Sequence, residues 1–175
     1  HFKKYYTGVA GKFALGSHFG INSDGEITQY LDCRNYANHV GTPGVNCASI
    51  GIDLINPFSS GKAAATAAAA GGAPRWPILS GWKILSPTGS TLSTVNDFFG
   101  PSMAQQRSLN KLLHALGTHV GVNVRHDART TTPQAFQKLS PNGIAAALVT
   151  GGVWHHAQLE GGRADSLGTN LASII

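Results

Sequence analysis

Alternating hydrophobic and polar positions predict a β-hairpin near the start of the chain. Residues 18–22 and 26–31 carry this alternation, and residues 23–25, Ser-Asp-Gly, separate them. Asp-Gly between two alternating runs is a strong hairpin signal. Residues 49–56, in contrast, form a nearly continuous apolar run that ends at Pro57. Such a run is typical of a central strand that is covered on both faces.

Apolar residues at three- and four-residue spacing predict the longest helix of the chain. Its hydrophobic positions are Met103, Leu109, Leu112, Leu113 and Leu116. Ser102 precedes this pattern as a favourable N-cap residue, and Gly117 follows it as a stop signal. We therefore predict a helix between these two residues.

Shorter elements follow this helix. We predict a strand at residues 120–124, a short helix within residues 130–139 and a small apolar segment at residues 144–149. With the hairpin, these elements indicate an α/β fold: a single domain over residues 1–175, with a central mixed β-sheet flanked by helices. The length of 175 residues suffices for one domain with a core and is short for two.

Residues 59–93 differ in composition from the rest of the chain. Glycine, alanine, proline and serine dominate this stretch, and Trp76 and Trp82 are embedded in it. We interpret it as a long excursion from the core. Its tryptophans either pin the excursion down or line a binding surface. Pinning is the preferred interpretation, because buried tryptophan usually serves packing.

Charge narrows the choice of partner. The net charge is +5 and the pI is near 9.5, which suggests an anionic partner. No Lys/Arg run alternates with aromatic residues, so nucleic acid is not the expected partner, whereas an anionic cell-wall polymer fits. The chain lacks an apolar run long enough to predict a membrane span. Its two cysteines, Cys33 and Cys47, either form a disulfide or stay reduced.

Candidate metal chemistry is concentrated in residues 152–168. Two adjacent histidines, His155 and His156, are followed by Arg163 and Asp165. Imidazole and carboxylate both bind zinc, and a catalytic zinc needs three protein ligands and one open position. Adjacent histidines are more often packed or exposed residues than ligands, so this spacing alone does not define a metal site.

Five motifs, in order, resemble those of the zinc-dependent N-acetylmuramoyl-L-alanine amidases, the type 2 amidase family, which shares its fold with the peptidoglycan recognition proteins. Residues 17–32, SHFGINSDGEITQYLD, are similar to the hairpin SxHFxIxxDGxIxQxxD. Residues 37–41, ANHVG, are similar to AWHAG, and residues 46–54, NCASIGIDL, to NxxSIGIEL. The helix at residues 105–116 is similar to QxxSLxxLL, and residues 156–165, HAQLEGGRAD, to HxxLxxGKxD.

The resemblance implies a zinc hydrolase that cleaves the amide bond between N-acetylmuramic acid and L-alanine of peptidoglycan. It implies Asp53 as the acidic residue near the zinc, where the family has glutamate. It also implies Arg163, in place of lysine, as the cation that stabilises the oxyanion. His39 and Asn46 are implied to border the substrate groove.

The resemblance further implies His156 and Asp165 as the second and third zinc ligands. We prefer His156 to His155 because Leu159 then keeps the register of the family motif. The first ligand of the family is a histidine at the end of a strand before the hairpin, and only His1 precedes His18 here. Either His1 is this ligand, or the ligand and its strand lie upstream. We prefer the second, because a sheet without its first strand has an open edge.

Two other functions remain open from the sequence. A peptidoglycan-binding module of the same fold without catalysis is the main alternative. An N-terminal His1 that chelates copper for glycan oxidation is a remote third. The cell wall is the expected place of action, with the compartment and the oligomeric state left open.

Overall fold

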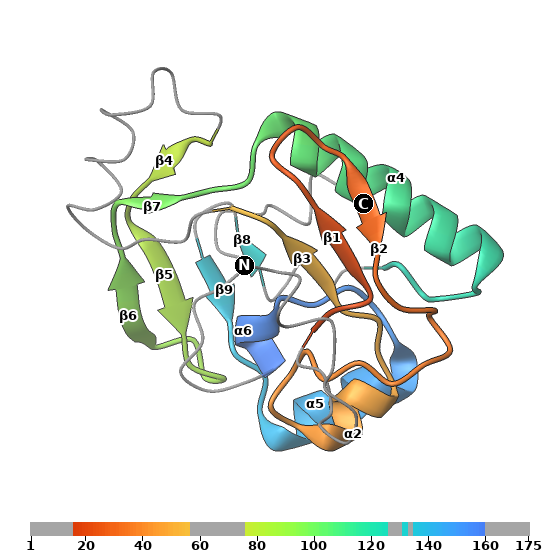
Figure 1. The fold of residues 1–175 in the computed structure, drawn as a ribbon. Helices are drawn as coiled ribbons and strands as arrows, with labels where there is room; N and C mark the ends of the chain where they lie inside the picture. Colours follow the sequence, from red (N-terminus) through yellow and green to blue (C-terminus); the bar gives the residue numbers. More distant parts are fainter. Residues whose placement is uncertain (1–15, 57–75, 126–130, 133–134, 160–175) are drawn as a thin grey trace.

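The computed structural model describes residues 16–56, 76–125, 131–132 and 135–159 (Figure 1). Within these ranges the strands are divided among three small sheets, and four helices are present. The two larger sheets are mixed, since each contains parallel and antiparallel pairs. The predicted α/β class is confirmed.

The predicted hairpin forms the first sheet. Strands β1 (Phe19–Ile21) and β2 (Ile27–Gln29) pair antiparallel around the Asp-Gly turn. Strand β3 (Ile52–Leu54) pairs parallel with β1, which gives the order β2-β1-β3. The apolar run at residues 49–56 thus contains a strand, as predicted. Among the described residues, however, β3 pairs only with β1, so the central position belongs to β1.

Helix α4 (Met103–His119) covers this sheet (Figure 1). Ser102 caps it, as predicted, and the structure adds a reciprocal capping box between Ser102 and Gln105. The helix continues two residues beyond the predicted stop at Gly117. Its leucines and two residues of β1 make up the first core cluster, which consists of Phe19, Ile21, Leu109, Leu112, Leu113 and Leu116.

The second sheet has the order β6-β5-β9-β8, and a separate strand pair lies beside it. Its strands are β5 (Trp82–Leu85), β6 (Thr91–Val95), β8 (Thr131–Thr132) and β9 (Ala135–Gln137), and the pair consists of β4 (Ile78–Leu79) and β7 (Phe98–Phe99). The described part of the predicted excursion, residues 76–93, therefore contains strands that the composition concealed. In β5 the period of two is present, because Trp82 and Ile84 are buried while Lys83 is exposed.

Tryptophan packing holds this part of the chain together. Trp82, Ile84 and Phe98 form a second core cluster, with Trp82 4% exposed. The rings of Trp82 and Phe98 meet edge to face at 6.3 Å between centroids. Trp76 lies beside Phe99 at 6.1 Å. The packing role predicted for Trp82 is confirmed.

Two of the later predictions are wrong. Residues 121–125 form no strand, and Val120 instead caps α4 by donating its N–H to the carbonyl of Leu116. The segment predicted as a short helix contains β8 and β9, since residues 131–132 and 135–137 pair antiparallel. The adjacent threonines favour strand, and proline at position 133 is incompatible with a helix interior.

Three short helices were not predicted as helices. They are α2 (Pro43–Cys47), α5 (Pro141–Thr150) and α6 (His156–Leu159). Proline occupies the first turn of α2 and of α5, where its missing N–H costs nothing. Ser140 caps α5 by accepting the N–H of Gly143 at 3.1 Å. No helix in the described ranges combines the length and hydrophobicity needed to cross a membrane.

Candidate active site

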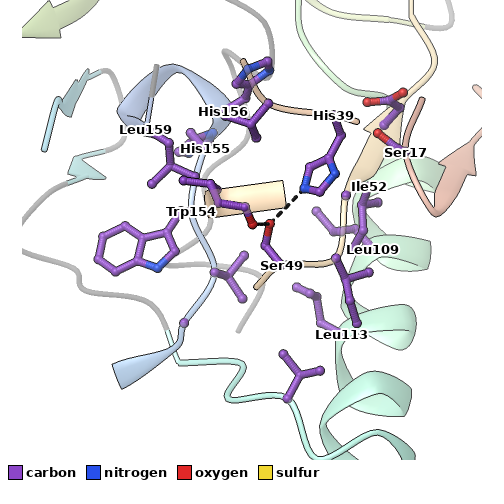
Figure 2. A pocket seen from close by; sticks show the side chains of 18 of the residues that line it. Ser17, His39, Ser49, Ile52, Leu109, Leu113, Trp154, His155, His156 and Leu159 are labelled. Carbon is purple, nitrogen blue, oxygen red and sulfur yellow. Dashed lines mark hydrogen bonds between the residues drawn. The ribbon is translucent and has the colours of Figure 1, made fainter. Parts of the chain in front are cut away.

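A cavity of about 400 Å³ lies between the first sheet, α4 and the segment at residues 147–159 (Figure 2). Side chains of β3 and α4 form an apolar wall. The polar side chains that line the cavity are Ser17, His39, Ser49, Asp53, Asn56, His155 and His156. Figure 2 shows His39 on one side of the cavity and the histidine pair on the other. Three of the predicted site residues, His39, Asp53 and His156, therefore line one cavity.

His39 is held in place at every polar atom of its side chain. Its Nδ1 lies 2.9 Å from the carbonyl oxygen of Ala37, and its Nε2 lies 2.9 Å from Oγ of Ser49 (Figure 2). The ring packs directly on the backbone of Gly51, where a Cβ atom would come within 2.5 Å of His39 Cγ. Glycine is therefore required at this position of the Ser-Ile-Gly-Ile motif. With both nitrogens bonded inside the protein, His39 cannot coordinate a metal without giving up one of these contacts.

Asn46 holds the loop that carries His39. It is 2% exposed, and its Oδ1 accepts the backbone N–H groups of His39 and Val40. Its Nδ2 donates to the carbonyl of Val40 and to Oδ1 of Asn38. Asn46 does not line the cavity. The structure thus places it behind His39 rather than in the groove where the sequence analysis expected it.

The adjacent histidines occupy different positions. His155 is 2% exposed, and its backbone N–H donates to Oε1 of Gln158 at 3.0 Å. Gln158 is buried as well and donates from Nε2 to the carbonyl of Gln137 in β9. His156 is half-buried at the start of α6, which lies between the two larger sheets in Figure 1. The second sheet therefore anchors the turn that brings both histidines to the cavity.

Electrostatics links His39 with the other polar side chains of the site. Burial lowers the pKa of His39, and the Ala37 carbonyl opposes this by accepting a hydrogen bond. The nearby His18 and His156 lower the pKa further, whereas the charge of Asp53 raises it. Burial also raises the pKa of the Tyr30 hydroxyl, and the charge of Asp53 adds to this effect. The charge of Asp53 therefore influences both His39 and Tyr30.

Three predicted residues, His1, Arg163 and Asp165, lie outside the described residues. Within the described ranges, no group of three His, Cys, Asp or Glu side chains is close enough to hold a metal ion. The donor chemistry of the cavity nevertheless fits zinc, since imidazole and carboxylate groups line it. His155 and His156 both line the cavity, so the choice between them stays a prediction.

His18 is structural, as expected. It is 1% exposed, its Nδ1 accepts the N–H of Gly51 at 3.0 Å, and its Nε2 lies 2.9 Å from the carbonyl of Asn35. Because a carbonyl only accepts, the proton of the neutral ring belongs on Nε2. Cys33 and Cys47 are free thiols.

Ser49 belongs to the site although its sequence position did not predict this. It lines the cavity, bonds to His39 and lies 2.6 Å from the carbonyl of Val45. Ser49 stands inside the motif NCASIGIDL, which was interpreted only as a strand. The available signal was a serine just before the buried β-run, at a position where the family motif also has serine.

Comparison with known proteins identifies the family. The sequence model of the N-acetylmuramoyl-L-alanine amidase family matches residues 2–166, so the chain belongs to this family. No curated protein and no solved structure matched the chain. The match spans all five motifs, from the hairpin to the predicted zinc-ligand segment.

Proposed function

We propose that the chain is a zinc-dependent hydrolase that cleaves the amide bond between N-acetylmuramic acid and L-alanine of peptidoglycan. The observation that carries this proposal is the cavity, in which Asp53 and His156 lie together beside His39. Membership of the N-acetylmuramoyl-L-alanine amidase family supports the same bond and the same substrate. The enzyme then acts on the cell wall.

His156 and Asp165 would hold the zinc, with His155 as the alternative to His156, and His1 is the candidate for the third ligand. These are nitrogen and oxygen donors of the kind that catalytic zinc uses, and three of them leave one position open. When bound, zinc lowers the pKa of a coordinated water toward about 7 and polarises the scissile carbonyl.

Asp53 and Arg163 supply the remaining chemistry. Asp53 takes a proton from the attacking water and later delivers it to the leaving amine as the C–N bond breaks. Its carboxylate has a shorter reach than the glutamate of the family motif. Arg163 stabilises the negative charge that develops on the carbonyl oxygen, a contribution commonly worth about 3 kcal/mol. Arginine preserves the charge of lysine and presents it as a planar fork.

His39 and Asn46 contribute to substrate binding in different ways. The His39 ring forms part of the cavity wall with its nitrogens committed to Ala37 and Ser49. Asn46 supports the backbone of the loop from behind. We assign substrate contact to the His39 ring and the indirect role to Asn46.

A non-catalytic peptidoglycan-binding domain is the second candidate. The aspartate at position 53 favours it, because this side chain is shorter than the glutamate of the family motif. The cavity wall is also largely apolar, with Trp154, Leu109 and Leu113 among its residues, which suits binding as well as catalysis.

The deciding experiment measures release of stem peptide from a purified muropeptide, together with zinc content by elemental analysis. We expect one zinc per chain, and in His156→Ala and Asp165→Ala a loss of turnover of at least about a hundredfold. Mutation of residues that only hydrogen-bond to metal ligands commonly lowers metal affinity or activity roughly 10- to 100-fold, so loss of a ligand itself should cost at least as much. His114→Ala is the matched control, because His114 is exposed on α4. Full turnover in both site variants would refute the assignment, and muropeptide affinity without zinc or turnover would establish the binding domain.

A further inference from the structure

Ser49 connects His39 to a second backbone carbonyl. Its Oγ lies 2.9 Å from Nε2 of His39 and 2.6 Å from the carbonyl oxygen of Val45. His39 in turn has its Nδ1 at 2.9 Å from the carbonyl oxygen of Ala37. Two carbonyls thus terminate a short chain of polar atoms along the cavity wall (Figure 2). A carbonyl can only accept a hydrogen bond, so the protons of this chain can be counted.

The count depends on the charge of His39. A neutral imidazole carries one proton and the Ser49 hydroxyl carries another, so two protons serve three contacts. With the ring proton on Nδ1, the hydroxyl proton goes either to His39 Nε2 or to the Val45 carbonyl. With the ring proton on Nε2, the contact with Ala37 is lost. A protonated ring makes all three contacts without any movement of non-hydrogen atoms.

The surroundings of His39 act against this protonated form. Burial disfavours the charge, and two imidazoles, His18 and His156, lie close enough to oppose it. The His18 ring stands edge-on to His39 at 5.7 Å between centroids. Among the carboxylates of the described residues, Asp53 is the one whose charge raises the pKa of His39. The hydrogen-bond chain and Asp53 therefore favour the protonated His39 ring, whereas burial and the neighbouring imidazole rings disfavour it.

We propose that Ser49 is a positioning residue of the site, which allows His39 to gain and lose a proton while its ring stays fixed. In the neutral state the Ser49 hydroxyl donates to His39 Nε2. When Nε2 takes up a proton, the hydroxyl rotates toward the Val45 carbonyl and accepts from Nε2 instead. The protonation state of His39 then sets the charge beside Asp53. This inference rests on the proposed amidase function only for its catalytic consequence.

The direct test follows the protonation of His39 by nitrogen-15 NMR across a pH titration. In Ser49→Ala the protonated ring loses the acceptor for its Nε2–H. Loss of a hydrogen bond to a charged group shifts a pKa by about one unit or more. We therefore expect the pKa of His39 to fall by about one unit. Ser49→Thr keeps the hydroxyl, and we expect it to restore the titration of the unmodified chain.

Ser108→Ala is the matched control. Ser108 is half-buried on α4, and its Oγ donates to the carbonyl of Gly25 at 2.6 Å, the same short contact that Ser49 makes to Val45. The variant thus loses an equivalent hydroxyl-to-carbonyl bond away from His39. We expect it to leave the His39 titration unchanged even if it lowers stability.

Muropeptide cleavage provides the second readout. In a profile of kcat/KM against pH, the transition that His39→Gln removes should move to lower pH in Ser49→Ala and stay in place in Ser49→Thr. An unchanged His39 titration in Ser49→Ala would overturn the inference, whatever the activity. A shifted titration in a chain that cleaves no muropeptide would refute the proposed function and leave the Ser49–His39 pair intact.

Discussion

The two larger sheets are stabilised in different ways. The sheet β2-β1-β3 packs on α4, and the buried amide of Gln105 connects the two by donating to the carbonyls of Ile21 and Ile55. The sheet β6-β5-β9-β8 relies on aromatic packing between Trp82 and Phe98. Nε1 of Trp82 is buried and has no hydrogen-bond partner among the described residues. Buried side-chain hydrogen bonds thus connect the first sheet to its helix, whereas side-chain packing holds the centre of the second cluster.

This difference matches the division of roles in the proposed function. The first sheet carries Asp53 and supports the His39 loop on Gly51. The second sheet supplies an anchor, because Gln158 ties the histidine turn to β9. Catalytic groups need fixed directions, which a hydrogen-bonded frame provides better than aromatic packing. An anchor only has to stay attached.

The largest effect is expected from Phe98→Ala. Phe98 is fully buried at the centre of the second cluster, so its removal leaves a cavity and should lower the free energy of unfolding by about 3–5 kcal/mol. Chemical denaturation measures this loss, and hydrogen exchange locates it. Since the two clusters have no residue in common, we expect faster exchange in β5 and β6 before α4 is affected.

Leu92→Ala is the control for Phe98→Ala. Leu92 is 57% exposed on β6, and its truncation should change stability by less than about 0.5 kcal/mol. Equal acceleration of exchange in α4 and in β5 after Phe98→Ala would show that the two clusters unfold as one unit.

Gln105→Leu should have the next largest effect. Leucine keeps roughly the volume of glutamine but leaves the Ile21 and Ile55 carbonyls and the Ser102 N–H without this partner. Buried polar groups left unpaired cost about 1–3 kcal/mol each. Because the Ile21 carbonyl keeps the N–H of Ile55 and Ile55 is only half-buried, we expect a total loss of about 2–4 kcal/mol. Gln106→Leu, on the next position of α4, should cost less than about 1 kcal/mol because Gln106 is half-exposed. Equal losses in both variants would contradict the role given to Gln105.

The first region was largely predictable from the sequence because its elements are marked by local signals. The Asp-Gly turn, the apolar run before Pro57 and the N-cap at Ser102 are local signals, and the structure confirms each of them. The leucine spacing identified four of the six residues of the first cluster. The candidate site followed from motifs at the same positions, which brought His39, Asp53 and His156 to one cavity.

The second region was hidden because its signals are short and its pairing is distant in sequence. Strand β5 pairs with β9 some fifty positions later, and neither strand has more than four residues. Distant contacts also explain why Ser49 was not predicted and why Asn46 was expected at the groove. The spacing of motif residues along the sequence indicates which of them lie near the groove. Their hydrogen-bond partners in the folded chain decide which side chains face it.

Trp82→Phe tests the packing of the second cluster at a smaller scale. The substitution removes an indole N–H that is buried without a partner among the described residues, and this gain offsets the loss of ring volume. We expect a change of about 1 kcal/mol or less in chemical denaturation, against about 3–5 kcal/mol for Trp82→Ala. If Trp82→Phe lowers the free energy of unfolding as much as Trp82→Ala, the indole N–H has a stabilising partner. Side-chain packing would then not be the only interaction that stabilises the second cluster.

The smallest expected effect is the pH dependence of the free energy of unfolding, which we expect to arise in the first region. Every described group with a clearly shifted pKa lies within residues 30–39, in the first region. The pKa of His39 is lowered in the folded chain, so the unfolded chain binds more protons below the usual value of about 6.5. Stability should therefore fall as the pH drops from 7.5 to 5, and less so in His39→Gln. Asp32 does not interfere, because its unfolded carboxyl titrates near 3.9. An identical pH slope in His39→Gln would assign the dependence to another group.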